Sequence, residues 1–332
     1  MFRIAVRHFI SVVMAVVALS ALAGDRGDNH PVTPLIISDS GLYAFDRDSL
    51  EMRWQQLNDQ QTSSPVLIDK RVLVSGSGGL YALDANSGKV IWQRNTAAQG
   101  FSVVPDGSRL FLASRDGSLQ ALNTEDGQVI WERRFPGWVY PPAKSNDLLF
   151  TGGSDGQLWA IERQSGDVRW SVSLGQEMVY SPVALSDGRI VVTTFGREAI
   201  ALDQQGNILW RQRYPTIVTT PLVVGSQLFF TGYDHSLLSV NADGGEVLWA
   251  RQLPERLSTS LDYRDGVLIA TFESGQVWEL SSQTGERLRD YQFPGEPIDT
   301  LRLAGGVSLG FIRSLDGPKV MKAIFSKHSK EQ

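Results

Sequence analysis

The amino-acid sequence predicts an all-β protein, a β-propeller built from four-stranded blades. Two spacings along the chain indicate this fold. Six tryptophans follow one another at intervals of 38, 39, 39, 40 and 39 residues, and turn residues recur at intervals of 38 to 42 residues. Tandem units of about 40 residues, each with four short strands, are the sequence pattern of propeller blades. The tryptophans are Trp54, Trp92, Trp131, Trp170, Trp210 and Trp249, and the turn residues are Gly41, Gly79, Gly117, Gly156, Gly196, His235, Gly275 and Gly317.

Residues 64 to 95 show the strands expected in each blade. Strand A is Ser64–Asp69, strand B is Arg71–Ser77, strand C is Gly79–Asp84 and strand D is Lys89–Arg94. These segments are rich in Val, Ile, Leu and aromatic residues and are separated by Gly, Asn, Asp and Ser. Pro65 opens strand A, and since proline has no N–H group it is confined to edge strands or strand starts. We therefore expect strand A at the edge of each sheet, along the central channel. The corresponding prolines of later units are Pro142, Pro182 and Pro221.

The ends of the chain decide how the ring closes. Eight turns favour eight blades, with the propeller over residues 35–325. The first unit, from Leu35, has no clear strand A, and the last unit stops after strand C. An alternative with seven blades places Ile298–Leu303 as the missing strand of the first blade. Residues 24–34 and 326–332 are expected to be loose segments outside the propeller.

Composition and charge exclude several functions. The chain has 332 residues and no cysteine, so disulfides, thiolate metal sites and catalytic thiols are excluded. Its formal net charge is -5, which becomes -7 without residues 1–23, because these hold Arg3 and Arg7 and no acid. Broad nucleic-acid binding draws its affinity from Lys and Arg that neutralise phosphates. This charge balance therefore argues against nucleic acid as a partner.

The first 23 residues resemble a signal for export. Arg3 and Arg7 form a basic start, Phe9 to Leu19 is apolar, and Ala21-Leu22-Ala23 has the small-x-small form of a cleavage site. The run without charges is too short for the roughly 20 residues that cross a bilayer. We expect a soluble periplasmic protein with no membrane span after cleavage. Because no cysteine follows the signal, we do not expect a lipoprotein.

The repeat resembles that of a known family. The segment from Ala82 to Trp92 has the sequence ALDANSGKVIW, and related segments recur up to Trp249. These segments are similar to the tryptophan-docking repeat of the PQQ-like propellers, in particular the BamB-like proteins of outer-membrane assembly. The resemblance covers residues 35 to 325. It implies that each of the six tryptophans docks on the neighbouring blade and is structural. A WD repeat fits poorly, since none of these tryptophans is followed by Asp.

No catalytic, metal-binding or cofactor-binding residue emerges from the sequence. His235 is the only histidine expected inside the propeller, and it lies in a hairpin turn, where local turn chemistry explains it. The PQQ-like family that this chain resembles also includes dehydrogenases that use pyrroloquinoline quinone (PQQ) with calcium. No acid of this chain matches their catalytic position by motif. A propeller that binds PQQ or another small molecule, including a quinone-dependent dehydrogenase, stays open as the alternative function.

The resemblance to BamB-like proteins favours a non-enzymatic scaffold that binds a protein partner in the bacterial envelope. Candidate contact residues are aromatic or arginine side chains outside the docking register, because Trp, Tyr and Arg dominate binding hot spots. Four such residues lie in or just before the connection from strand D to the next strand A: Arg133, Arg134, Trp138 and Tyr140. The alternative is that Trp138 and Tyr140 only pack between blades.

Overall fold

The structure is a computed structural model that describes residues 35–324, apart from residues 39–40, 47–48, 50, 59, 61, 97–100, 259, 293–296, 303–306 and 313–318. The expected signal, the segment 24–34 and the tail 326–332 lie outside the described residues. Over the described part all regular structure is β-strand, and it contains no helix that could cross a membrane. The chain divides into two compact units, one of residues Pro65–Pro254 and one of the remaining residues on both sides.

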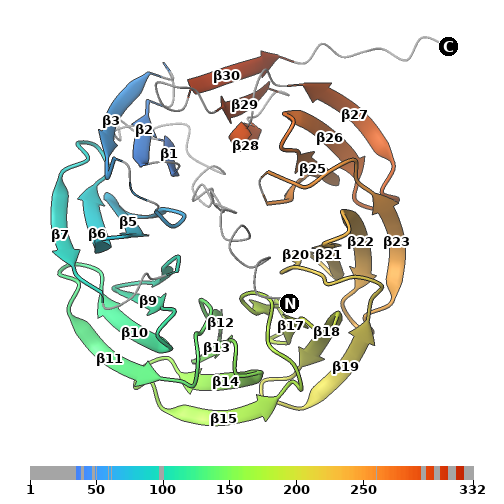
Figure 1. Ribbon diagram of the computed structural model, residues 1–332, viewed down its shortest axis with the longest axis horizontal. Coiled ribbons are helices and arrows are strands. Elements are labelled where there is room, and N and C mark those ends of the chain that lie inside the picture. The colour runs from blue at the N-terminus through green and yellow to red at the C-terminus, as the bar shows by residue number, and fades with distance from the viewer. Residues whose placement is uncertain are drawn as a thin grey trace, which may run out of the picture. The chain divides into compact units, whose positions relative to one another are not determined.

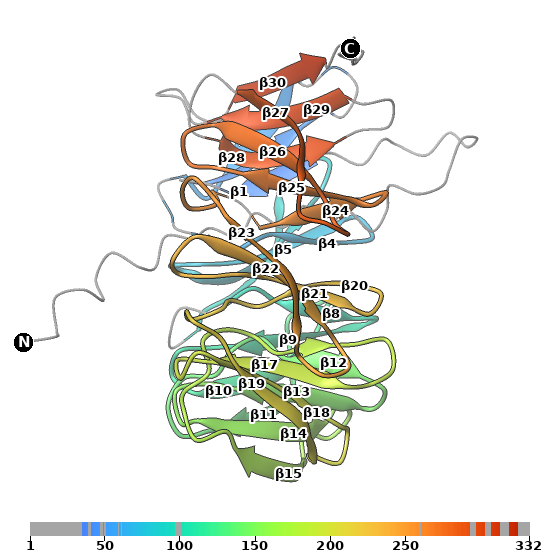
Figure 2. The same ribbon diagram turned by 90° about the vertical axis from the view of Figure 1, so that its right-hand side faces the viewer.

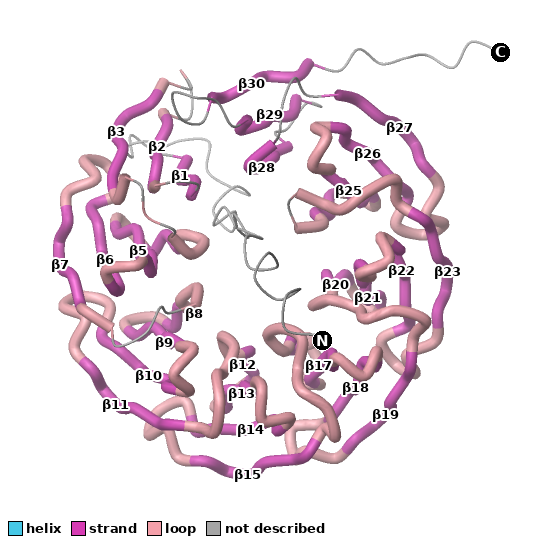
Figure 3. The backbone as a smooth tube through the Cα atoms, viewed as in Figure 1, coloured by secondary structure: helices cyan, strands magenta, loops and turns pink. Residues whose placement is uncertain are grey.

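The unit Pro65–Pro254 contains five antiparallel four-stranded sheets, each a meander of consecutive strands (Figure 1). Figure 3 shows the same succession, with short loops between strands. The sheets are β4 (Val66–Ile68), β5 (Arg71–Gly76), β6 (Gly79–Asp84) and β7 (Val90–Arg94); β8 (Val104–Asp106), β9 (Arg109–Ala113), β10 (Ser118–Asn123) and β11 (Val129–Arg134); β12 (Ala143–Ser145), β13 (Leu148–Gly152), β14 (Gln157–Glu162) and β15 (Val168–Ser173); β16 (Val183–Ala184), β17 (Ile190–Thr194), β18 (Glu198–Leu202) and β19 (Ile208–Arg213); and β20 (Leu222–Val224), β21 (Gln227–Thr231), β22 (Ser236–Asn241) and β23 (Val247–Gln252).

The strands expected in residues 64 to 95 are confirmed to within two residues at each end. Strand C is found over Gly79–Asp84 as expected, and strand A is shortened to Val66–Ile68. The first strand of each sheet pairs on one side only. The proline before β4 therefore costs no ladder hydrogen bond. Within this unit the last strand of each sheet runs along the outer side in Figure 1; these strands are β7, β11, β15, β19 and β23. Figure 2 shows strands of the same sheets from the side.

The other unit holds three sheets. Two of them have three strands, as expected for the first and last repeats. The strand over Pro297–Arg302 pairs with Val307–Ile312 and not with the first sheet, so the described pairing does not contain the completed first blade of the seven-blade alternative. The sheets are β1 (Leu35–Ser38), β2 (Leu42–Phe45) and β3 (Met52–Gln56); β24 (Asp262–Arg264), β25 (Val267–Thr271), β26 (Gln276–Ser281) and β27 (Arg287–Gln292); and β28 (Pro297–Arg302), β29 (Val307–Ile312) and β30 (Lys319–Ile324).

The core of the unit Pro65–Pro254 lies between neighbouring sheets. Phe150 and Leu158 of one sheet pack in one cluster with Ile190 and Val192 of the next, and all four are almost completely buried. Every residue of β17 is buried, since both faces of this strand are covered by another sheet. This explains why the B strands are nearly continuous apolar runs and do not alternate with polar residues.

Candidate functional site

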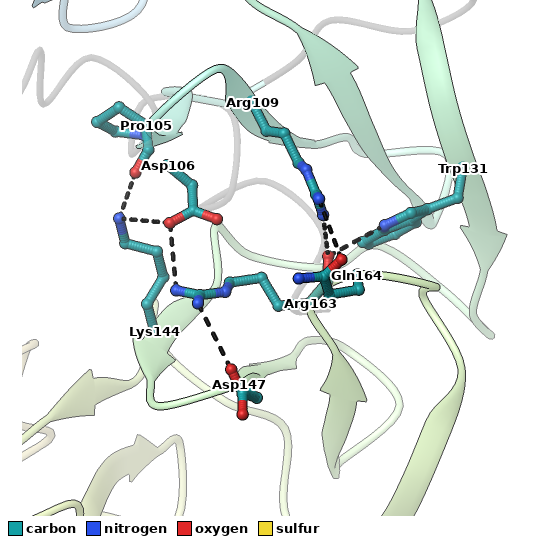
Figure 4. Close-up of polar contacts among 8 residues, drawn as sticks. All are labelled: Pro105, Asp106, Arg109, Trp131, Lys144, Asp147, Arg163 and Gln164. Carbon is teal, nitrogen blue, oxygen red and sulfur yellow. Dashed lines mark hydrogen bonds and ion pairs between the residues drawn. The ribbon is translucent and has the colours of Figure 1, made fainter.

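Four of the repeated tryptophans dock on the next sheet of the unit Pro65–Pro254. Trp131 donates a hydrogen bond from Nε1 to the Arg163 carbonyl at 3.2 Å (Figure 4), and Trp210 makes the equivalent bond to the Ala242 carbonyl at 2.9 Å. The indole carries a large apolar surface and one donor, and both are used at the sheet interface. The other two bonds run from Trp92 to the Thr124 carbonyl and from Trp170 to the Gln204 carbonyl, at 3.2 and 2.9 Å.

Four glycines, each four residues before a repeated tryptophan, receive the tryptophan of the preceding sheet. Gly166 has φ +75, and a Cβ atom built on it would lie 2.6 Å from the ring of Trp131. A larger residue would meet both a strained backbone and an occupied space. Trp54 is buried, and Trp249 is half-buried with its ring centroid 5.9 Å from that of Phe229. The same close approach holds for Gly127, Gly206 and Gly245 against Trp92, Trp170 and Trp210.

Polar side chains reinforce one of these interfaces near the A–B turns (Figure 4). Asp106 forms ion pairs with Lys144 at 3.6 Å and with Arg163 at 3.3 Å, both from the next sheet. Arg163 is also 3.7 Å from Asp147, and its carbonyl accepts a bond from Arg109 at 3.4 Å. One carbonyl therefore receives both the docked indole and an arginine.

A second interface repeats this arrangement. Arg189 donates to the Ala242 carbonyl at 2.8 Å and pairs with Asp243 at 2.8 Å. The Ala242 carbonyl is the acceptor that Trp210 uses. The Tyr214 hydroxyl donates to the Gly245 carbonyl at 2.9 Å, and burial raises the pKa of this phenol well above its usual value of 10. These contacts identify the C–D turns as the points where successive sheets are held together.

Two of the residues expected to bind a partner are engaged in ion pairs. Arg133 donates to the Gly166 carbonyl at 2.8 Å and pairs with Asp167 of the next sheet at 2.6 Å, so its head group joins two sheets. Hydrogen bonds from Ser165 and then Arg133 hold the pKa of the Asp167 carboxyl below its usual value. Arg134 is exposed and pairs with Asp116 at 3.4 Å. A partner that used Arg133 would have to compete with these bonds, because the guanidinium is already engaged at the sheet interface.

The connection that carries Trp138 and Tyr140 runs beside the end of β13. Trp138 exchanges hydrogen bonds with Ser154, and the Tyr140 amide donates to the Gly152 carbonyl at 2.9 Å. A Cβ atom on Gly153 would lie 1.7 Å from the Trp138 carbonyl oxygen, so only glycine permits this approach. Both aromatic side chains are partly buried, and their backbone is held in place.

Tyr140 is the centre of an aromatic row that crosses three sheets. Its ring centroid is 5.5 Å from that of Phe101 and 6.3 Å from that of Tyr180, and each of the three residues comes from a different D-to-A connection. The guanidinium of Arg115 lies 5.7 Å from the Phe101 ring centroid. Burial, with the nearby Tyr180 and Glu177, raises the pKa of the Tyr140 phenol to about 12, and Arg115 opposes this shift. We call Phe101, Tyr140 and Tyr180 the aromatic row.

Sequence reasoning found Tyr140 and missed its two neighbours in the row. The signal was present, because Phe101, Tyr140 and Tyr180 are 39 and 40 residues apart, the same spacing as the tryptophans. Arg115 had no such signal; it lies in the turn after β9, close to Phe101 because the Phe101 amide donates to the Ala113 carbonyl at the end of β9.

The residues considered for catalysis or metal binding do not converge. His235 lies in the turn between β21 and β22 with φ +64, exposed to solvent, while Asp234 accepts a hydrogen bond from the Ser236 amide at 3.0 Å. Within the described residues no group of three or more His, Asp or Glu side chains is placed to hold a metal ion.

A family comparison decides the relationship. The family model described as outer membrane protein assembly factor BamB matches residues 17–102, 97–181 and 173–304, most of the chain. The chain belongs to the BamB family of PQQ-like repeat propellers.

Individual BamB proteins match over shorter segments. BamB of Bordetella pertussis is 32% identical over 107 residues, which cover 30% of this chain and 28% of the relative. BamB of Nitrosomonas eutropha is 31% identical over 110 residues, 31% of this chain and 27% of the relative. The matched segments thus span little more than a quarter of the length of these relatives.

Solved structures show the same fold over nearly the whole chain. The crystal structure of BamB from Moraxella catarrhalis has a TM-score of 0.70 at 15% identity and covers 89% of this chain and 95% of its own. The computationally designed Ika8 protein has a TM-score of 0.72 at 14% identity, covering 92% and 99%. At these identities the likeness establishes the β-propeller fold and not an activity.

Proposed function

We propose that this BamB-family protein is an exported, non-enzymatic scaffold of the bacterial cell envelope that takes part in outer-membrane protein assembly. The family match supports this role, because the relatives carry the name of an assembly factor. The expected signal in residues 1–23 supports export to the periplasm. A scaffold needs no converging catalytic groups, only a surface that holds a partner.

The aromatic row is the observation that carries the choice of surface. Its rings are packed against one another, so they are held rigid before a partner arrives and lose little conformational entropy on binding. Neither the Tyr140 nor the Tyr180 hydroxyl forms a hydrogen bond within the described part of the chain, so both groups can bond to a partner. Arg115 adds a cation beside the row. Aromatic and arginine side chains of this kind dominate binding hot spots.

Of the residues expected from the sequence, Tyr140 fits this surface best. Trp138 lies two residues before it in the same connection and is half-buried. Arg134 is exposed, yet it pairs with Asp116, so a partner would have to compete for it. Arg133 fits this surface least well, because its guanidinium is bonded to Gly166 and Asp167 of the next sheet.

The test is an in-cell crosslink and pull-down of the tagged full chain, with captured envelope proteins identified by mass spectrometry. The variant Tyr140→Phe with Tyr180→Ala removes both hydroxyls and one ring while keeping the central packing. The matched control is Ile91→Ala, an outer-strand residue that is 47% exposed and lies outside the row. We expect outer-membrane assembly proteins with the wild type and the control, and at least a roughly tenfold loss with the double variant. Equal capture by all three folded proteins would reject this surface, and capture of no assembly protein by the wild type would reject the function.

A further inference from the structure

The outer strand of each sheet in the unit Pro65–Pro254 has one open edge. Each of these strands pairs with its neighbour on one side only, so alternate N–H and C=O groups point away from the sheet. Open edges attract other strands, and proteins commonly protect them with charged side chains. The five outer strands are β7, β11, β15, β19 and β23.

One of the five lacks this protection. After its tryptophan, β15 continues as Ser171-Val172-Ser173, with no charged residue. The other four strands each carry at least one arginine there. In the other unit β3 is also uncharged after its tryptophan, but it continues with two glutamines, whose long polar side chains can cover an edge. The protecting arginines are Arg94 in β7, Arg133 and Arg134 in β11, Arg211 and Arg213 in β19, and Arg251 in β23.

The register of β15 shows which backbone groups are free. The Leu174 amide donates to the Gly156 carbonyl at 2.9 Å, and the ladder continues through Leu158↔Val172. Since bonded residues alternate in an antiparallel pair, Val172 bonds inward and the N–H and C=O groups of Ser171 and Ser173 point to the open edge. Both serines are exposed. Within the described residues neither serine side chain forms a hydrogen bond.

Side chains limit the open stretch at both ends. Before the tryptophan, Arg169 is bonded to Glu162 of its own hairpin. After Ser173, the Leu174 carbonyl accepts a hydrogen bond from Arg211 of the next sheet at 3.0 Å. The free edge is therefore three residues long. The chain then leads into the connection that carries Tyr180.

We propose that the β15 edge at Ser171–Ser173 binds an uncharged edge strand of a partner protein, which adds as a fifth strand to this sheet. The backbone groups of the two serines supply the hydrogen bonds of strand addition. The absence of charge selects for a strand with small or apolar side chains, whereas the arginines reject such a strand at the other four edges. The inference rests on the proposed scaffold function and adds a second contact, separate from the aromatic row.

The experiment places a photo-crosslinking amino acid at position 173 of the full chain in cells or, for comparison, at position 250 of β23, whose edge carries Arg251. The partner captured from position 173 is purified with the wild-type chain, and amide hydrogen exchange is measured in the complex. We expect crosslinking at 173 to exceed that at 250, and exchange at Ser171 and Ser173 to slow by roughly tenfold or more, as for amides bonded in a ladder. The crosslinked peptide of the partner must lie on an edge strand.

Three variants make the test specific. Ser171→Pro removes an outward N–H without breaking a ladder bond, and the pair Ser171→Lys with Ser173→Lys gives β15 the charge of its neighbours. Both should lose the slowed exchange and the 173 crosslink, while the control Ala250→Lys on an already protected edge should change neither. Unchanged exchange at the two serines, equal crosslinking at 250, no capture at 173, or capture only of a second copy of the chain would overturn the inference. If the aromatic-row variants abolish capture and the β15 variants do not, the scaffold function stands and the edge proposal fails.

Discussion

Gly166→Ala tests the docking of tryptophan on glycine, the contact on which the repeat depends. Gly166 has φ +75, and the added Cβ atom would lie 2.6 Å from Cδ2 and Cε3 of Trp131. Gly175→Ala is the matched control, because Gly175 has a similar φ of +83 and nothing within 4 Å of the added atom. The two variants share the backbone strain and differ in the collision with the indole.

The expected loss of stability can be divided into a part from backbone strain and a part from the collision with the indole. Left-handed backbone costs an L-residue about 1–2 kcal/mol, and the lower entropy of the unfolded alanine chain returns about 0.4–1 kcal/mol. Gly175→Ala should therefore lower the free energy of unfolding by about 1 kcal/mol. At Gly166 the collision adds about 1–3 kcal/mol for overpacking a close-packed site. The total for Gly166→Ala is about 2–4 kcal/mol.

The assay is urea unfolding followed by tryptophan fluorescence and by circular dichroism. A double-mutant cycle with Trp131→Ala, which alone should cost about 3–5 kcal/mol, completes it. In the Trp131→Ala background the penalty of Gly166→Ala should fall to that of Gly175→Ala, because the ring it meets is gone. Equal penalties for the two glycine variants in the wild type, or full additivity with Trp131→Ala, would refute the docking argument.

Three further predictions follow from the same contacts. The pKa of Tyr140 is about 12 in the folded protein against 10.0 for the ordinary phenol, so the unfolded chain loses this proton first as the pH rises. The free energy of unfolding of the wild type, measured by chemical denaturation, should therefore fall relative to Tyr140→Phe between pH 10 and 12, on the order of 2 kcal/mol. Parallel curves of stability against pH for the two proteins would count against burial of the phenol. Arg189→Ala removes the bonds to the Ala242 carbonyl and Asp243 and should lower the free energy of unfolding, measured thermally, by about 1–2 kcal/mol. Arg213→Ala, at an exposed arginine, should lower it by under about 0.5 kcal/mol, and equal losses would contradict the role of Arg189 at the interface. The Ser87 hydroxyl and amide donate to Asp84 and hold its pKa below 3.8, so these bonds stabilise the folded protein above that pH and the stabilisation is lost as the pH falls through the folded pKa. Ser87→Ala should raise the pKa of Asp84 in an NMR titration, and an unchanged pKa would disprove the assignment.

The architecture could be predicted from the sequence because its signals are local and repeated. Each unit must place a hairpin glycine, an apolar B strand and a tryptophan at the same distances, so the spacing of Trp92, Trp131 and Trp170 alone identifies the blade. A glycine stands four residues before every repeated tryptophan except Trp54, and four of these glycines are covered by the ring of the preceding unit. These features recur along the chain because each blade packs on its neighbour through the same contacts.

The surface depended on contacts that no spacing in the chain encodes. Arg133 in β11 and Tyr140 in the connection that follows it looked equivalent as binding residues, yet Arg133 joins two sheets while Tyr140 lies between Phe101 and Tyr180. The open edge at Ser171–Ser173 likewise required the register of β15, which decides whether an amide bonds inward or points away from the sheet. The sequence by itself therefore determined the repeat, the strands and the docking register, whereas only the tertiary structure decided which side chains and backbone groups stay free, because that depends on atoms brought together from different blades.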